Sequence, residues 1–115
     1  MDIADIQAAA TRIADLVQRT PSLPSRYWSE VVGGRVWLKA ECLQRTGSFK
    51  LRGAANMVRM LSPEERARGV IAASAGNHAQ GVAVAAQAEG IRAVVVMPAG
   101  ASFAKVEAAR GYGAE

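Results

Sequence analysis

Cysteine, histidine and lysine are scarce in this 115-residue sequence, and each shortage narrows what the chain can do. The single cysteine excludes a disulfide framework within these residues. The single histidine, His78, has no second histidine and no nearby carboxylate, so we expect no metal site. No apolar run approaches the roughly 20 residues that cross a bilayer, and residues 1–5 (MDIAD) lack the basic, then apolar, pattern of a signal peptide. We therefore predict a cytoplasmic protein.

Aromatic residues are also few, at 5%, and the basic residues do not cluster. The formal charge of +4 comes from 14 basic and 10 acidic residues spread singly along the chain. The nearest approach to a basic cluster, Arg66 and Arg68, directly follows two glutamates. Without a basic run or interleaved aromatics, the charge does not indicate nucleic-acid binding. We interpret Cys42 as a small buried residue, and Trp28 and Trp37 as packing residues.

The sequence contains 50% hydrophobic and 21% charged residues, a composition typical of globular proteins. In the first half, apolar spacing predicts a helix from residue 3 to residue 17, closed by Thr20-Pro21. The same reasoning predicts four further segments, namely a short helix at 28–32, a strand at 36–40, a loop at 43–48 and a helix at 49–61. Residues 62–65 (SPEE) then form a near-complete helix start.

The second half alternates short apolar runs with helical patterns. We predict buried strands at 69–73 and 92–97, a polar loop at 74–77, and helices at 78–89 and 102–110. This order indicates a right-handed βαβ unit with a parallel sheet, and hence an α/β fold. Residues 111–115 lie where a further strand is expected to begin, so we predict that the chain is cut off.

Lys50 is the first candidate for chemistry because lysine occurs only three times and this one opens a helix after a glycine-containing loop. A positive charge is disfavoured at a helix N-terminus, which should lower the lysine pKa and favour the neutral amine. A neutral amine is what covalent catalysis on a carbonyl requires. An ordinary solvated lysine on a surface helix is the alternative.

The loop at 74–77 (SAGN) is the second candidate, since it joins a predicted strand to a predicted helix. Backbone N–H groups at a helix N-terminus bind anions such as carboxylates and phosphates. The loop also follows the carboxyl end of a parallel strand, where open α/β sheets place their ligands. A capping serine with a tight glycine turn is the alternative.

Residues 47–54 (GSFKLRGA) resemble the lysine motif of fold-type II pyridoxal-phosphate enzymes, and residues 43–46 (LQRT) narrow the resemblance to the threonine/serine dehydratase branch. Residues 74–81 (SAGNHAQG) resemble the substrate loop of that branch. Three further stretches resemble its next landmarks in order, at 96–98 (VMP), 105–106 (KV) and 112–115 (YGAE). Two long motifs at compatible spacing are far more specific than a lone glycine pattern. The resemblance covers nearly the whole chain and favours the functional interpretations.

By position, the resemblance implies that Lys50 holds pyridoxal 5'-phosphate covalently and later moves the proton on the substrate's Cα. It implies that Phe49 packs near the cofactor ring and that Asn77 hydrogen-bonds the phenolic oxygen. The substrate carboxylate would be bound by four residues of the loop, Ser74, Gly76, Asn77 and His78. The implied reaction converts L-threonine or L-serine into a 2-oxo acid and ammonia.

The resemblance also implies a two-lobed fold-type II architecture, similar to the tryptophan synthase β subunit. Residues 1–68 would belong to the larger lobe, and residues 69–115 would open the smaller one. The phosphate loop and the residue facing the pyridine nitrogen would lie beyond residue 115, so we expect the isolated chain to be inactive. The complete parent would be a homo-oligomer acting on a small amino acid, with no nucleic-acid or membrane partner.

Two alternatives stay open. Another fold-type II activity, such as serine racemase or cysteine synthase, would use the same lysine. Serine racemases of this family tend to carry serine at the position of Ala75, where its hydroxyl acts as an acid or base on the opposite face, so alanine there disfavours racemisation. The other alternative is a non-catalytic fragment with at most weak ligand binding.

Overall fold

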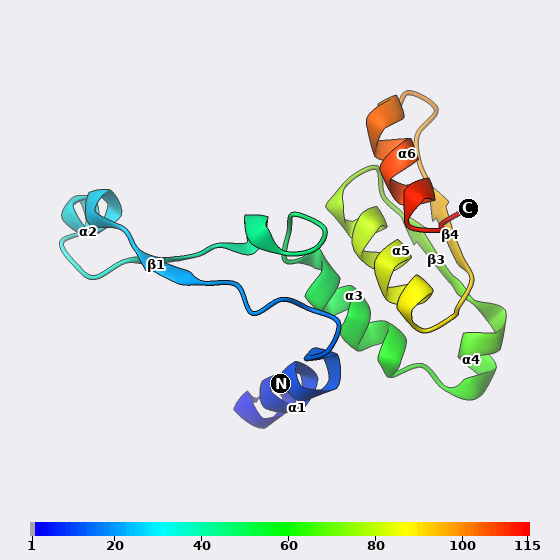
Figure 1. Cartoon of the computed structure of the whole chain (residues 1–115), viewed down its shortest axis with the longest axis horizontal. Coiled ribbons are helices and arrows are strands. Elements are labelled where there is room, and N and C mark those ends of the chain that lie inside the picture. Colours follow the sequence, from blue (N-terminus) through cyan, green and yellow to red (C-terminus); the bar gives the residue numbers. More distant parts are fainter. Residues whose placement is uncertain (1) are drawn as a thin grey trace.

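The computed structural model describes residues 2–115, which form a packed body and a projecting arm (Figure 1). The arm, residues 21–40, carries strands β1 (Ser22–Pro24) and β2 (Trp37–Lys39) with helix α2 (Arg26–Val32) between them. The body consists of five α-helices and the strand pair β3–β4. The molecule extends over 50 × 37 × 21 Å, and the arm reaches away from the body along its longest axis (Figure 1).

Helix α1 (Ile3–Ile13) begins with a capping box, in which Asp2 and Asp5 each accept a hydrogen bond from the other's backbone N–H. The predicted extension to residue 17 is wrong, because the helix ends at Ile13. Arg59 of α3 explains the early end. Its guanidinium donates to the Arg12 carbonyl and to the Asp15 carboxylate, so these two groups turn toward α3.

The arm is an antiparallel hairpin in which Ser22 lies opposite Lys39 and Pro24 lies opposite Trp37. The predicted helix and second strand are confirmed, but no pattern in the sequence indicated β1. None of residues 21–40 is buried. Trp28 and Trp37 are 47% and 59% exposed, so the interpretation of these two as packing residues is wrong. They are exposed because no described element lies over the arm.

Three short elements lead from the arm to the sheet. The 3-10 turn η1 (Glu41–Leu43) precedes the lysine loop, and Cys42 within it is exposed rather than buried, because its turn lies on the surface. Helix α3 (Lys50–Arg59) follows, and α4 (Pro63–Arg68) starts with the predicted capping box. There, the Ser62 hydroxyl accepts from the Glu65 N–H at 3.3 Å and the Glu65 carboxylate accepts from the Ser62 N–H at 2.8 Å.

The predicted βαβ unit is present as β3 (Val70–Ala73), α5 (Asn77–Ala88) and β4 (Ala93–Val96), followed by α6 (Phe103–Gly111). The two strands are parallel, with Val70 opposite Ala93. The expectation that both strands are buried is only half right, since Ile71 is 73% exposed. Helices α5 and α6 cover one face of the pair (Figure 1), and nothing in residues 2–115 covers the other.

The last residue lies beside β4 in the manner of a third parallel strand. The Glu115 N–H donates to the Ala93 carbonyl at 2.9 Å, and the Val95 N–H donates to the Glu115 carbonyl at 2.8 Å. In a parallel ladder, a residue hydrogen-bonds to the two residues that flank its partner on the neighbouring strand, as Glu115 does here with Ala93 and Val95. This geometry agrees with the strand expected to begin in this region.

The core lies between α3 and α5 and is built largely from small residues. Leu51 of α3 is fully buried, in a cluster that includes Val82, Val84 and Ala85 of α5. Ala83 and Ala86 of the same helix are buried in a second cluster, with Ala93 of β4 and Ala109 of α6. Alanine and glycine let two helix backbones approach closely, so the close packing fixes the relative position of α3 and α5. These are the two helices that carry the candidate residues. No helix within residues 2–115 is long and apolar enough to cross a membrane.

Candidate functional site

Lys50 is the first residue of α3, presented by a loop whose hidden residues fix its backbone. Gly47 adopts a left-handed conformation (φ +67°) that glycine accepts without strain. The buried Ser48 hydroxyl accepts from the Lys50 N–H at 3.4 Å. Phe49 and Lys50 are exposed, and the Lys50 Nζ lies 4.6 Å from the centroid of the Phe49 ring, a cation–π contact. The helix was predicted to start at Phe49, one residue earlier.

Behind Lys50, an ion pair ties the first turn of α3 to the base of the arm. Arg52 donates two hydrogen bonds to the Glu41 carboxylate, at 2.8 and 2.9 Å, and Thr20 donates a third at 2.5 Å. The Arg52 bonds lower the pKa of Glu41 from 4.5 to about 2. Planar, bidentate pairs of this kind hold a fixed geometry. Sequence reasoning missed this pair, because Glu41 and Arg52 meet only through the fold.

The loop after β3 continues the sheet before it turns into α5. The Ser74 N–H donates to the Val96 carbonyl at 3.0 Å, and the Ser74 hydroxyl accepts from the Gly76 N–H at 3.2 Å. Gly76 is the N-cap of α5, which starts at Asn77 rather than at His78 as predicted. No side chain of the described residues caps this helix, so its first-turn N–H groups are open to a ligand.

The structure brings the Lys50 end of α3 and the N-terminal part of α5 together. The two helices lie side by side (Figure 1), and they touch backbone to backbone at Gly81, where a Cβ would lie 3.1 Å from the Lys50 carbonyl carbon. Asn77 and His78 precede Gly81 by four and three residues, so they lie on the same face of α5, one turn nearer its start. In the sequence, Lys50 and the 74–78 segment lie in separate motifs. The packing of α3 against α5 brings the two motifs close together.

Two open depressions border the 74–78 segment. One, of about 430 Å³, lies at the carboxyl ends of β3 and β4 and is lined by Ser74 and Ala75 together with residues 96–98. The other, of about 470 Å³, is apolar and lies between α3, β3 and α5, with His78 at its lining. The predicted ligand position at the carboxyl end of the sheet therefore has room for a small molecule.

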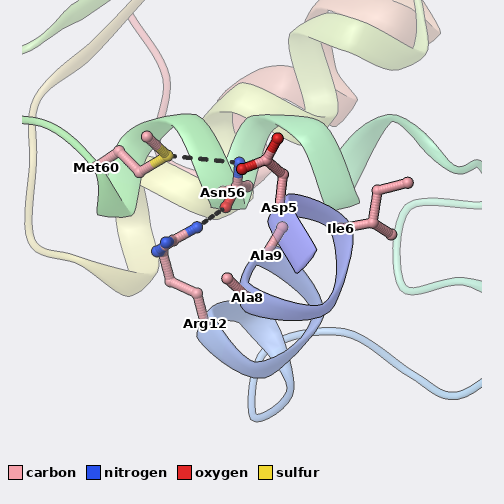
Figure 2. Close-up of a pocket in the computed structure, with 7 residues that line it drawn as sticks. All are labelled: Asp5, Ile6, Ala8, Ala9, Arg12, Asn56 and Met60. Carbon is pink, nitrogen blue, oxygen red and sulfur yellow. Dashed lines mark hydrogen bonds between the residues drawn. The ribbon is translucent and has the colours of Figure 1, made fainter. Parts of the chain in front are cut away.

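A further pocket lies between α1 and α3, away from these residues (Figure 2). Its volume is about 400 Å³. Arg12 donates to the Asn56 side-chain oxygen, and the Asn56 amide contacts the Met60 sulfur at 3.6 Å. The Arg12–Asn56 bond joins α1 to α3, whereas the Asn56–Met60 contact lies within the α3 segment, and none of the residues that line this pocket belongs to the candidate site.

The side chains at the candidate site are free to bind a ligand. Within residues 2–115, the side chains of Lys50, Asn77 and His78 accept or donate no hydrogen bond, and the buried Thr46 hydroxyl also lacks a partner. Sequence reasoning missed Thr46, which carries no signal beyond its place in the lysine loop. An exposed amine at the start of α3, together with an amide and open N–H groups at the start of α5, fits a ligand with an aldehyde and an anionic group. Within the same residues, no group of three side chains could hold a metal.

Comparison with known proteins gives this arrangement a context. Residues 13–115 match the family described as pyridoxal-phosphate dependent enzyme. An L-threonine ammonia-lyase of Thermotoga maritima is 53% identical over 98% of this chain and 28% of its own length. A catabolic L-threonine dehydratase of Staphylococcus aureus is 49% identical over 100% of this chain and 34% of its own length. The chain thus spans about a third of the length of these relatives.

Solved structures show the same fold over the whole chain. A threonine deaminase from T.th. matches with a TM-score of 0.84 and 49% identity, covering 100% of this chain and 36% of that one. Maize serine racemase matches with a TM-score of 0.90 and 43% identity, covering 99% of this chain and 35% of the racemase chain. The expected fold class, an α/β part of a fold-type II enzyme, is confirmed. Backbone similarity is high for both activities, whereas sequence identity is higher for the deaminase.

Proposed function

Because this chain belongs to the family of pyridoxal-phosphate dependent enzymes, we propose that it forms the N-terminal part of an enzyme that converts L-threonine or L-serine into a 2-oxo acid and ammonia. The observation that carries the proposal is the backbone contact between the Lys50 end of α3 and Gly81 of α5, the helix whose uncapped N-terminus has open anion-binding N–H groups. Relatives named threonine ammonia-lyase and threonine dehydratase, at about half identity over the chain, support the reaction class.

Lys50 is the proposed catalytic residue. Its Nζ would attach to the aldehyde carbon of pyridoxal 5'-phosphate and later accept the proton from the substrate's Cα. When bound, the cofactor supplies the electron sink that weakens the bonds to Cα. Phe49, whose ring already lies against the Lys50 Nζ, would pack beside the cofactor ring, and Asn77 would donate to its phenolic oxygen.

The 74–78 segment is the proposed carboxylate site. The Ser74 hydroxyl and the N–H groups of Asn77 and His78 would bind the substrate carboxylate, assisted by the positive end of the α5 dipole, and Gly76 would hold Ser74 in place through its own N–H. A carboxylate held there would direct the Cα–H bond toward Lys50 across the α3–α5 contact. Orientation of that bond decides which bond of the substrate breaks.

The remaining assignments follow from the same family membership. Residues 1–68 would belong to the larger lobe of the complete enzyme and residues 69–115 to the smaller. The complete enzyme would be a homo-oligomer, and a cytoplasmic location is supported by the single cysteine. The 115-residue chain alone would show no turnover, because it offers a lysine and a carboxylate loop but no recognisable phosphate cradle.

Serine racemase activity is the second candidate, favoured by the match to the maize enzyme. Racemisation needs a proton donor on the face of the substrate opposite Lys50. Ala75, which lines the depression at the end of the sheet, has no exchangeable proton. A complete enzyme with this loop should therefore eliminate water much faster than it racemises serine, and Ala75→Ser should raise racemisation. Racemisation as fast as deamination in the unchanged loop would contradict this order.

The test of the proposal uses a chimera in which residues 1–115 replace the matching segment of the Thermotoga maritima ammonia-lyase. Borohydride reduction and peptide mapping should place the pyridoxyl label on Lys50, and Lys50→Ala should lower kcat at least about 1,000-fold, the loss of a covalent and proton-transfer group. Lys105→Ala, which removes an exposed lysine of α6, is the matched control and should retain kcat. Label on another lysine, or turnover that survives Lys50→Ala, would refute the assignment.

A further inference from the structure

Gly81 interrupts a helix that is otherwise rich in alanine. It lies within α5 and is buried, as are Ala79 before it and Val82 after it. Glycine weakens a helix interior relative to alanine, so helix formation alone does not account for it. A glycine in this setting requires a packing or functional reason.

The reason is a backbone contact with the residue that carries the proposed amine. A Cβ at position 81 would lie 3.1 Å from the Leu51 nitrogen, 3.1 Å from the Lys50 carbonyl carbon and 3.2 Å from the Lys50 carbonyl oxygen. All three atoms belong to the first turn of α3, and backbone atoms cannot move aside as a flexible side chain can. By contrast, a Cβ at Gly53 or Gly111 would meet nothing within 4 Å.

The helix α3 has little room to retreat from such a Cβ. Leu51, one residue after Lys50, is fully buried, and Ala55 is 1% exposed. Arg52 is held by its two hydrogen bonds to Glu41, and α1 packs against the rest of α3 through Arg59. A methyl group at position 81 would therefore be accommodated by a shift of a few tenths of an ångström between the two helices.

We propose that Gly81 is a positioning residue, whose missing side chain sets the distance between Lys50 and the ligand-binding start of α5. The proposal rests on the function proposed above. Asn77 and His78 share the face of α5 that carries Gly81, so a shift at Gly81 changes their position relative to Lys50. A misplacement of 1 Å costs on the order of 100-fold in rate. A shift of a few tenths should then lower kcat about three- to tenfold.

The experiment uses Gly81→Ala in the chimera, with Gly111→Ala as the matched control in an exposed, uncrowded helix position of α6. Gly81→Ala should lower kcat about three- to tenfold, with little change in KM, while borohydride reduction still labels Lys50 fully. Gly111→Ala should leave kcat, KM and the labelling of Lys50 unchanged. Circular dichroism checks that each variant is folded.

A double-mutant cycle separates positioning of Lys50 from a general structural role. In Lys50→Ala, free methylamine should restore part of the turnover. The free amine is not attached to α3, so its position does not depend on the helix contact. Adding Gly81→Ala to this background should change the restored rate less than twofold.

Three results would overturn the proposal: an equal loss in both backgrounds, loss of the Lys50 label in Gly81→Ala, or a kcat within twofold of the parent. The last result, with Lys50→Ala still inactive, would refute only the role of Gly81. Survival of turnover in Lys50→Ala without amine would refute the proposed function itself.

Discussion

The arm and the α3–α5 helix pair use apolar residues in opposite ways. The arm carries leucine, valine, tyrosine and both tryptophans, yet none of residues 21–40 is buried. Helix α5 is made mostly of alanine and small residues, and seven of its twelve positions are buried. The apolar side chains of the arm are larger than those of α5, so side-chain size does not account for the difference.

The difference shows that burial depends on the element that lies opposite. Small residues on α5 let α3 approach until the two backbones touch, and β4 and α6 bury Ala83 and Ala86 in a second cluster. The arm leaves the body as a two-stranded hairpin, and within residues 2–115 no helix or strand packs on either of its faces. A two-stranded hairpin without such a partner is marginally stable.

The largest expected effect compares one chemical change in both regions. In the 115-residue chain, Leu51→Ala should lower the free energy of unfolding by about 2–5 kcal/mol, because the fully buried side chain leaves a cavity. Leu23→Ala, at a position 54% exposed on β1, should change it by less than about 0.5 kcal/mol. Chemical denaturation followed by circular dichroism measures both.

The same two substitutions in the chimera test whether the rest of the enzyme covers the arm. If the other two thirds of the enzyme cover the arm, Leu23→Ala should become as costly as a buried leucine, about 2–5 kcal/mol. Equal costs for Leu23→Ala and Leu51→Ala in the 115-residue chain would show that the arm is already packed, and the contrast would fail.

A smaller effect concerns the junction between the two regions, where Glu41 binds Arg52. The Glu41 pKa of about 2 lies below its ordinary value of 4.5, so the ionised form is stabilised by folding. This stability is complete above pH 4.5 and is lost as the pH falls from 4.5 to about 2. The loss should be roughly 2 kcal/mol, measured as the free energy of unfolding across that range.

Glu41→Gln supplies the control for this titration. It should cost roughly 2 kcal/mol at pH 7, because Arg52 keeps only weaker hydrogen bonds, and it should flatten the decline between pH 4.5 and 2. The other acidic residues stay in place, so an undiminished decline in this variant would assign the pH dependence to them and not to the junction.

The smallest expected effect tests whether the backbone contact between α3 and α5 is confined to Gly81. Gly53→Ala adds a methyl group inside α3 where nothing lies within 4 Å, so it should raise the free energy of unfolding by about 0.5–1 kcal/mol. Gly81→Ala should gain less or lose stability, since its methyl meets the α3 backbone. Thermal unfolding of the two variants gives the comparison. Equal gains in the free energy of unfolding would show that a methyl group fits between α3 and α5 at Gly81.

Local chemistry in the sequence determined most of the individual elements. The serine, proline and glutamates at 62–65 specify the start of α4 because their hydrogen bonds close within four residues. Alternating apolar runs and helical patterns predicted β3, α5 and β4, since each pattern depends only on neighbours along the chain. The motifs around Lys50 and residues 74–81 also indicated the family without any structure.

Tertiary structure decided everything that needs a partner far along the chain. Arg59 ends α1 by binding groups 44 and 47 residues away, and Glu41 meets Arg52 only after the chain turns through the lysine loop. Trp28 and Trp37 are exposed because no element within residues 2–115 lies over the arm, and the local sequence does not encode this. The distance between Lys50 and the start of α5 is likewise set by a backbone contact at Gly81, because helices stop approaching each other only where their atoms touch.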